Sequence, residues 1–153
     1  MVKKLLLSLG IFLLIVGAAV IWQFINVRGG QQGGGNLKEI TIGDAAFFVE
    51  IADTPATRTK GLSGHKQLKE NEGMLFIFDS LGQYSFWMKD MNSPLDIIWI
   101  KENKVVGFAE NAPPAGNAPL TIYTPPQPVD KVLEINAGSI KKLGIKIGDT
   151  IEF

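Results

Sequence analysis

The chain has 153 residues, no cysteine, and equal numbers of acidic and basic residues, 15 of each. The absence of cysteine excludes disulfide bonds, thiolate catalysis and zinc sites built from cysteine. Only three basic residues and no acidic residue precede position 37, so residues 37–153 carry 12 basic and 15 acidic residues, a net charge of −3. Because nucleic acid is bound by dense basic surfaces, this balance excludes nucleic acid as a partner.

The first 27 residues predict a transmembrane anchor. Lys3 and Lys4 precede an uncharged apolar stretch, residues 5–25, which as a helix would be about 32 Å long, close to the hydrocarbon thickness of a bilayer. Positive charge concentrates before this stretch, and only Arg28 follows it closely. The positive-inside rule then places the N-terminus inside and the rest of the chain outside the cell membrane.

A cleaved signal peptide is the alternative interpretation of the same segment. Its apolar core would be residues 5–16, with small residues at 17–19 as the cleavage site, and the product would be secreted. Cleavage there would leave the apolar sequence VIWQFIN at the new terminus. We therefore favour the uncleaved anchor.

A linker and a single domain follow the anchor. Residues 28–36, RGGQQGGGN, contain five glycines and no apolar side chain to bury, which predicts a flexible tether. Residues 37–153 have the usual length of one independently folded domain.

The first half of this domain predicts a hairpin, a short helix and three further strands. Residues 38–53 form two β-rich runs separated by the turn signal Gly43-Asp44. Thr54 followed by Pro55 is typical of a helix start, and the helix would end at the next glycine. The predicted strands that follow are GMLFIF (73–78), YSFWMK (84–89) and LDIIWI (95–100).

The second half predicts more strands around a proline-rich loop. KVVGFAE would pair with LDIIWI in a second hairpin. Six of the eight prolines lie between Pro113 and Pro128, and proline lacks the amide that a sheet interior needs. KVLEINAG predicts a strand, Ser139 and Gly144 would begin and end a short helix, and IKIGDTIEF alternates around a Gly-Asp turn. We expect a mostly β (α+β) fold, a compact β-rich domain or partial barrel with one or two short helices, preceded by the single transmembrane helix.

Three segments of the domain resemble the DUF192 family, also called UPF0127. They are RTKGLSGHKQLKENEGMLFIF, FWMKDMNSPLDIIWI and VLEINAGSIKKLGIKIGD, and together they cover nearly all of residues 58–153. The resemblance implies a small β-rich fold, often secreted or membrane-anchored, and implies no reaction. This chain has FWMKDM where the family usually has FWMKNT, which argues against recognition through an amide at position 90. It also has Leu68-Lys69 where the family usually has Leu-Pro.

The candidate ligand site centres on the strand that contains Trp87. Because side chains alternate along a strand, Trp87 and Lys89 would project from one face, and Phe86 and Met88 would fill the core on the other. An indole beside an ammonium group can bind a ligand through stacking and charge-assisted contacts. The alternative is that the lysine stem only covers the ring at a strand end.

Asp96 is a charged residue in an otherwise apolar predicted strand. A buried carboxylate needs a partner, and Lys89 and Arg58 are the candidates. Either a salt bridge or an Asx-type bond fixes the connection before the strand, or Asp96 lines a polar cleft with Lys89 and Arg58. In the second case the proline-rich loop, with Tyr123, would form a wall of the cleft.

Other residues give weaker signals. Glu134 is expected to face solvent or a cleft rim, and acid–base work with Asp96 would need a close approach of the two carboxyls. His65 is the only histidine, and one imidazole cannot build a zinc site. The methionines could bind Cu(I), but they suit the core as gap fillers. We therefore predict no metal and no cofactor.

The sequence predicts a non-catalytic, membrane-tethered extracytoplasmic domain that binds a small ligand or a peptide. The candidate binding residues are Arg58, Trp87, Lys89, Asp96 and Tyr123. One alternative is a hydrolase in which Asp96 acts as base while Lys89 or Arg58 stabilises an anion, although no nucleophile-elbow, Walker or dinucleotide motif occurs. The other alternative is a structural component of an envelope complex.

Overall fold

A computed structural model describes residues 37–116 and 119–153 of the chain. The predicted anchor, residues 1–27, and the predicted linker, residues 28–36, lie outside the described residues. Within the described part, no helix is long and apolar enough to cross a membrane.

The described domain consists of nine strands and two short helices, which confirms the mostly β prediction. The strands are β1 (Lys38–Ile42), β2 (Ala45–Ala52), β3 (Glu72–Gly82), β4 (Phe86–Trp87), β5 (Leu95–Lys101), β6 (Lys104–Ala112), β7 (Ile122–Tyr123), β8 (Val129–Asn136) and β9 (Ile151–Glu152). The helices are α2 (Pro55–Lys60), between β2 and β3, and α3 (Ser139–Leu143), between β8 and β9.

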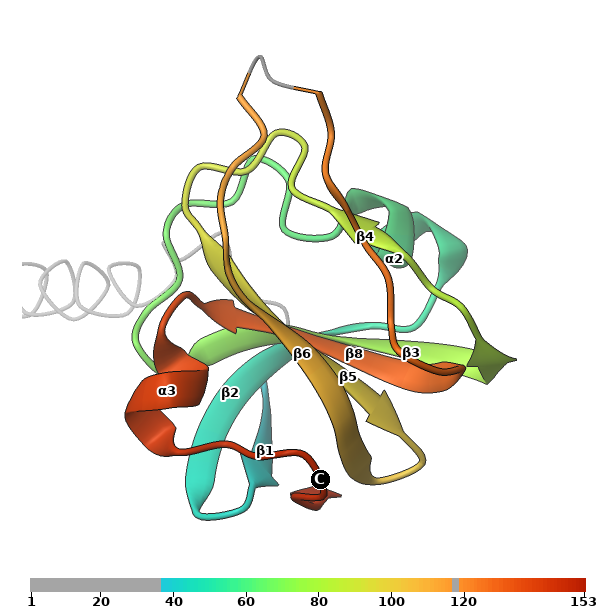
Figure 1. Cartoon of the computed structure of the whole chain (residues 1–153). Helices are drawn as coiled ribbons and strands as arrows, with labels where there is room; N and C mark the ends of the chain where they lie inside the picture. Colours follow the sequence, from blue (N-terminus) through green and yellow to red (C-terminus); the bar gives the residue numbers. More distant parts are fainter. Residues whose placement is uncertain (1–36, 117–118) are drawn as a thin grey trace, which may run out of the picture. The chain divides into compact units, whose positions relative to one another are not determined.

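Seven strands form one sheet in the order β6-β5-β8-β3-β2-β1-β9, while β4 pairs with β7 in a separate sheet of two strands. Neighbouring strands are antiparallel except β2 and β3, which run parallel and are joined by a crossover that contains α2. The large sheet curls into a half-barrel, with α2 beside β4 at one end and α3 at the other (Figure 1).

The two edge strands of the large sheet meet through the last residues of the chain. The amide of Val105 donates to the carbonyl of Asp149 at 2.9 Å, and the amide of Ile151 donates to the carbonyl of Asn103 at 2.9 Å. An isolated antiparallel bridge joins Lys104 to Thr150 between these bonds. This contact satisfies backbone groups that a free sheet edge would leave unpaired.

Each face of the large sheet packs against a hydrophobic core of its own. Leu133 and Ile135 of β8 belong to the first core, which includes residues of β1, β2 and α3. Val132 belongs to the second core, together with Phe76 of β3 and Met88. Burying an aliphatic or aromatic side chain of this size contributes roughly 1.5–3 kcal/mol relative to exposure, so alternation along the central strands decides which side chains stabilise which core.

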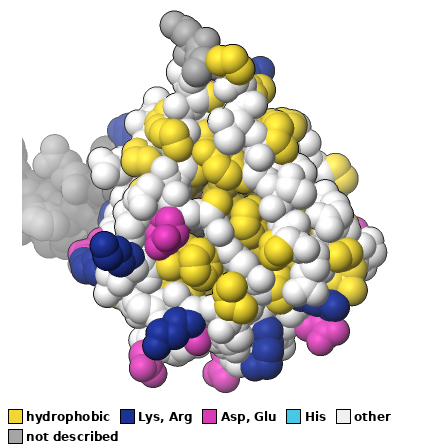
Figure 2. Space-filling model, in the orientation of Figure 1, with side chains coloured by type: hydrophobic (Ala, Val, Ile, Leu, Met, Phe, Trp, Pro, Cys, Tyr) yellow, Lys and Arg dark blue, Asp and Glu magenta, His cyan; other side chains and the backbone are white. Residues whose placement is uncertain are grey.

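One face of the domain carries mainly uncharged side chains. In Figure 2, hydrophobic side chains occupy its centre and upper part, while most charged side chains lie around its lower edge. In the same orientation, β4 and the proline-rich loop lie in the upper part (Figure 1). On this face, the charged side chains are therefore mostly separated from the hydrophobic ones.

Local sequence signals predicted the hairpins and the first helix correctly. β1 pairs with β2 and β5 pairs with β6, both antiparallel. α2 begins after Thr54, whose hydroxyl accepts a hydrogen bond from the Thr57 amide at 3.1 Å, while the Thr57 hydroxyl accepts one from the Thr54 amide at 3.0 Å. This capping box satisfies two amides that have no partner inside the helix. The strand predicted at 84–89 is shorter than expected, because only Phe86–Trp87 pairs.

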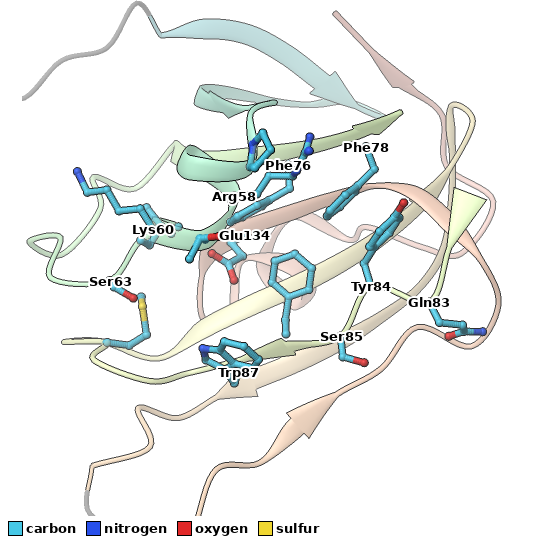
Figure 3. Close-up of a pocket in the computed structure, with 16 residues that line it drawn as sticks. Arg58, Lys60, Ser63, Phe76, Phe78, Gln83, Tyr84, Ser85, Trp87 and Glu134 are labelled. Carbon is cyan, nitrogen blue, oxygen red and sulfur yellow. The ribbon is translucent and has the colours of Figure 1, made fainter. Parts of the chain in front are cut away.

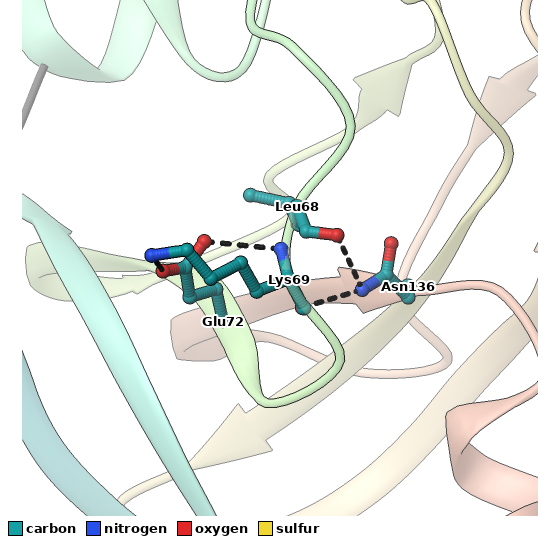
Figure 4. Close-up of polar contacts among 4 residues, drawn as sticks. All are labelled: Leu68, Lys69, Glu72 and Asn136. Atoms are coloured by element: carbon teal, nitrogen blue, oxygen red, sulfur yellow. Dashed lines mark hydrogen bonds and ion pairs between the residues drawn. The ribbon is translucent and has the colours of Figure 1, made fainter.

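The segment between α2 and β3 is fastened to the end of β8. The side-chain amide of Asn136 donates to the carbonyl oxygens of Leu68 and Lys69, at 3.2 and 2.7 Å (Figure 4). The backbone amide of Lys69 donates to Glu72 Oε2 at 3.0 Å, and its ammonium group lies 2.8 Å from Glu72 Oε1. These bonds hold in place the loop that leads from the helix into β3.

The pairing predicted for Asp96 is wrong, and so is the predicted cap of α3. Asp96 is fully buried, and its two carboxylate oxygens accept hydrogen bonds from the backbone amides of Asn111 at 2.8 Å and Ile140 at 2.9 Å. Ser139 is buried, the residue before the helix is Gly138, and the helix has no side-chain cap of its own. A carboxylate from β5 therefore supplies the charge that the first turn of α3 favours.

The Asp96→Asn variant is expected to lose about 2–3 kcal/mol of unfolding free energy, because a carboxamide keeps one acceptor but leaves the other buried amide unpaired. Denaturant unfolding of the full chain measures the loss. Asp79→Asn, at an exposed position of β3, is the matched control and should change the free energy by less than about 0.5 kcal/mol. Equal stabilities of the two variants would contradict the role given to Asp96.

Candidate ligand-binding site

A pocket of about 460 Å³ lies between α2 and the segment that contains β4. Small-molecule sites have volumes of roughly 300–1,000 Å³ and are lined mainly by apolar and aromatic groups. The lining residues come from α2 and the turn after it, from β3, from the β4 segment and from β8: Pro55, Arg58, Thr59, Lys60, Gly61, Leu62, Ser63, Phe76, Phe78, Gln83, Tyr84, Ser85, Phe86, Trp87, Met91 and Glu134.

Five aromatic rings form much of this lining. The rings of Phe76 and Phe86 meet edge to face, with centroids 4.9 Å apart. The rings of Phe78 and Tyr84 are stacked, with centroids 3.5 Å apart. Trp87 is 53% exposed and forms part of the rim. Such pairs contribute roughly 0.5–1.5 kcal/mol beyond the area that they bury, so the rings support one another and the pocket wall.

Two local features place these rings: the alternation of side chains along β3 and the space left by a glycine at its end. Phe76 and Phe78 are two residues apart on β3 and therefore point to the same side of the strand. Tyr84 folds back over the end of β3, where a Cβ added to Gly82 would come within 2.8 Å of its ring. A larger residue at position 82 would therefore force the Tyr84 ring off Phe78.

Arg58 is held by the protein itself. Its Nη1 donates to the carbonyl oxygens of Asp53 and Ile77, each at 2.7 Å. The centre of its guanidinium group lies 5.3 Å from the centroid of the Phe78 ring. Arg58 thus fastens α2 to β3 and fixes the distance between two walls of the pocket.

Glu134 brings a carboxyl group into the apolar interior of the pocket. The residue is 5% exposed, and its neighbours on the adjacent strands are Met74 of β3 and Ile97 of β5. Within the described residues, no hydrogen bond or ion pair reaches its carboxyl group. Burial alone raises the pKa of Glu134 from its ordinary value of 4.5 to about 8, so the group is mostly protonated at neutral pH.

Figure 3 shows how Glu134 lies relative to the other lining residues. Its carboxyl group points into the middle of the pocket, with Ser63 and Trp87 on one side and Phe78 and Tyr84 on the other. An aromatic enclosure around a single desolvated carboxyl group is able to bind a polar group of a ligand through hydrogen bonding or charge.

The pocket brings together two of the five site residues predicted from the sequence, Arg58 and Trp87. Lys89 follows Met88, which is buried in the second core, and its side chain is exposed. Tyr123 pairs with Phe86 across the two-stranded sheet and packs against the second core. Neither Lys89 nor Tyr123 is a lining residue.

Asp96 lies on the opposite face of the large sheet from Glu134. Along β5, Ile98 belongs to the first core and Ile97 to the second, so alternation places Asp96 on the side of Ile98. Glu134 lies on the side of the second core, where the pocket opens. The two carboxyl groups therefore cannot act together on one substrate.

The central residue of the pocket, Glu134, was expected at a rim or in solvent, and that expectation is wrong because the residue is buried. The sequence did contain a signal for this burial. Glu134 lies two residues after Val132, on a strand that has apolar residues on both faces. A strand with apolar residues on both faces is central in its sheet, and a glutamate in it must face a core or a cavity.

The remaining charged groups near the helix do not form a metal centre. His65 Nε2 lies 3.7 Å from Glu50 Oε2, and both side chains are partly exposed. In residues 37–116 and 119–153, no three potential metal-ligating side chains come together.

The Glu134→Gln variant is expected to be more stable than the natural chain at high pH. Below pH 4.5, folded and unfolded chains both hold the proton, so the carboxyl has no effect. Between pH 4.5 and 8 only the unfolded chain releases the proton, so the natural chain loses stability as pH rises, by up to about 1.4 kcal/mol per pH unit. From pH 4 to pH 8 the advantage of Glu134→Gln should grow by about 4 kcal/mol.

Denaturant unfolding of both chains at pH 4, 6 and 8 measures this advantage. Glu39→Gln, at an exposed position of β1, is the control and should follow the natural chain throughout. If the advantage of Glu134→Gln is the same at pH 4 and pH 8, the carboxyl is not protonated in the folded chain as described.

Comparison with known proteins gives a family and two similar structures. The model of the DUF192 family, described as "Uncharacterized ACR", matches residues 38–153. A proposed transcription regulator from Sinorhizobium meliloti 1021 has a similar crystal structure, with 32% sequence identity and a TM-score of 0.70 over 78% of this chain and 97% of that chain. A protein of unknown function from Novosphingobium aromaticivorans DSM 12444 shares 34% identity, with a TM-score of 0.74 over 80% of this chain and 89% of that chain. No curated protein matches the sequence. The chain belongs to the DUF192 family.

Proposed function

We propose that the chain is a membrane-tethered extracytoplasmic domain that binds a small ligand in the aromatic pocket beside α2. The observation that carries the proposal is the Glu134 carboxyl group, which is buried, points into the pocket and has no partner among the described residues. The family assignment itself supplies no activity.

An unpartnered buried polar group is costly, and folded proteins keep few of them. Leaving a buried donor or acceptor without a hydrogen bond costs about 1–3 kcal/mol, and strongly shifted carboxyl groups in clefts concentrate at functional sites. Glu134 has no hydrogen-bond partner among the described residues, but its oxygens are not among the fully buried unpartnered atoms, so they border the pocket volume, where a ligand can supply the partner. The volume of about 460 Å³ suits a small molecule better than an extended peptide.

Binding is favoured over catalysis by the composition of the pocket wall. Among the lining residues, Glu134 is the only Asp, Glu or His. The Ser63 hydroxyl donates to the carbonyl of Lys89 at 3.3 Å, and within the described residues it has no hydrogen bond to a basic group. A hydrolase based on Asp96 has little support, since both oxygens of that carboxylate accept backbone amides on the other face of the sheet. Nucleophilic catalysis needs a base within reach of the nucleophile.

The regulatory role in the name of the S. meliloti protein is not carried over to this chain. Residues 37–153 hold 12 basic and 15 acidic residues, whereas binding to nucleic acid depends on neutralising phosphates with many basic side chains.

The membrane location rests on residues 1–27. The full chain is expected to sediment with membranes and to stay there after an alkaline carbonate wash, whereas a variant that lacks residues 1–27 should be soluble. Protease added to intact spheroplasts should digest residues 37–153, because the positive-inside rule puts them outside. Mass spectrometry of the mature chain distinguishes an anchor from a cleaved signal peptide, and a full-length chain in the cytosolic fraction would contradict the proposal.

Ligand binding is expected to depend on Trp87. The full chain in lipid nanodiscs is screened against a panel of small aromatic and aliphatic compounds by saturation-transfer NMR, and the hits are titrated. Trp87→Ala should weaken binding by about tenfold, since a lost ring contact costs about 1.4 kcal/mol.

Ile122→Ala is the matched control for this experiment. Ile122 is 52% exposed and pairs with Trp87 across the two-stranded sheet, but it is not a lining residue. The proposal is rejected if no compound binds, or if both variants weaken binding equally.

A further inference from the structure

We infer that the ligand of the aromatic pocket is a small organic ammonium compound, bound by the Glu134 carboxylate together with the rings of Phe76, Phe86 and Trp87. The inference rests on the proposed function, because it names the chemical class of the molecule that the pocket takes. It follows from the position of the carboxyl group, from the rings around it and from the positions of the nearby cations.

Glu134 lacks a counter-ion among the described residues. The cationic side chains that line the pocket are Arg58 and Lys60, both from α2, and the described residues place no ion pair between either of them and Glu134. Burial is the only cause of the raised pKa of Glu134, with no lowering by a neighbouring cation. A positively charged ligand would supply what the protein does not.

The two cationic side chains in the pocket lining are either occupied by other partners or remote from Glu134. Arg58 donates to two backbone carbonyl oxygens and lies over Phe78. Lys60 is exposed, and its side chain extends away from Glu134 in Figure 3. The only other titratable group in the lining besides these and Glu134 is the Tyr84 phenol, which donates to the Ser80 carbonyl at 2.9 Å. None of these groups competes for the carboxyl.

The aromatic rings of the pocket are complementary to a positively charged ligand. The face of an aromatic ring is electron-rich and attracts a cation, with about 0.5–2 kcal/mol per contact and the larger values where water is excluded. Phe78 already stacks on Tyr84 and lies near Arg58, whereas the other rings in the lining are Phe76, Phe86 and Trp87. A carboxylate beside such rings is complementary to an ammonium group, whereas a carboxylate ligand would meet repulsion from both.

A neutral ligand is the main competitor. Protonated Glu134 could donate one hydrogen bond to a carbonyl or hydroxyl oxygen, but such a ligand would gain nothing from the electron-rich ring faces. The net charge of −3 on residues 37–153 also favours the approach of cations. The two classes differ in their proton balance, because an ammonium ligand requires Glu134 to lose its proton and a hydrogen-bond acceptor requires Glu134 to keep it.

Three probes of nearly equal size separate the classes: 2-phenylethylammonium, 2-phenylethanol and phenylacetate. Each is titrated into the full chain in nanodiscs by calorimetry at pH 6, 7 and 8. The affinity for 2-phenylethylammonium should rise at least tenfold from pH 6 to pH 8, because a carboxyl with a pKa of about 8 ionises over this range. Calorimetry at pH 6.5 in two buffers of different ionisation enthalpy should show about one proton released per ligand bound.

Two variants test the role of Glu134 in binding. Glu134→Gln should bind 2-phenylethylammonium at least tenfold more weakly at pH 8 and show no pH dependence, while Glu39→Gln should behave like the natural chain. The pH profile and the proton count need no variant, so they stand even if Glu134→Gln is altered in stability.

The outcomes distinguish this inference from the proposed function. Stronger binding of 2-phenylethanol or phenylacetate in the same pocket, or an ammonium affinity that does not change with pH, would overturn the inference and leave the ligand-binding function intact. Failure of all three probes, together with failure of the wider panel to bind, would overturn both.

Discussion

The structure depends on the two-sided burial of the central strand β8. Its residues alternate between two hydrophobic cores, with Leu133 and Ile135 on one side and Val132 on the other. This alternation leaves no solvent-facing position in the middle of the strand, so Glu134 must enter the second core or a cavity beside it. The pocket is thus a consequence of sheet geometry: α2 and the β4 segment cover the second core but leave an opening at Glu134.

The buried carboxyl group of Glu134 destabilises the fold, whereas the buried carboxylate of Asp96 stabilises it. Both carboxyl groups are buried, but the carboxylate of Asp96 accepts two backbone amides and joins β5 to β6 and α3. Glu134 has no such partners among the described residues, and burial raises its pKa to about 8. The contrast shows that burial alone does not decide the role of a carboxyl, because the partners determine whether it stabilises the fold or stays reactive toward a ligand. The Asp96 carboxylate accepts its hydrogen bonds from the protein itself, whereas the Glu134 carboxyl group faces the pocket.

The parts of the structure that the sequence predicted are those decided by neighbours in the chain. The Gly43-Asp44 hairpin, the Thr54 cap of α2 and the β5–β6 hairpin depend on residues a few positions apart. The partners of Asp96 are 15 and 44 residues away, and Glu134 meets Arg58 and Trp87 in one pocket only after the sheet has formed. The alternation of side chains identified the two faces of β8, but it did not show that one face would border a pocket instead of a fully packed core.

Two of the departures from the usual family pattern, Asp90 and Lys69, act on the backbone, whereas a third, Met91, lies in the pocket wall. Asp90, where the family usually has asparagine, has a φ of 56°, and aspartate and asparagine both tolerate this left-handed conformation better than most residues. Lys69, where the family usually has proline, uses its backbone amide to bind Glu72, a bond that proline could not make. Neither of these two residues lines the pocket, but Met91 does, where the family usually has threonine. The departures therefore affect turns outside the pocket and, at position 91, the pocket wall itself, where a thioether stands in place of a hydroxyl.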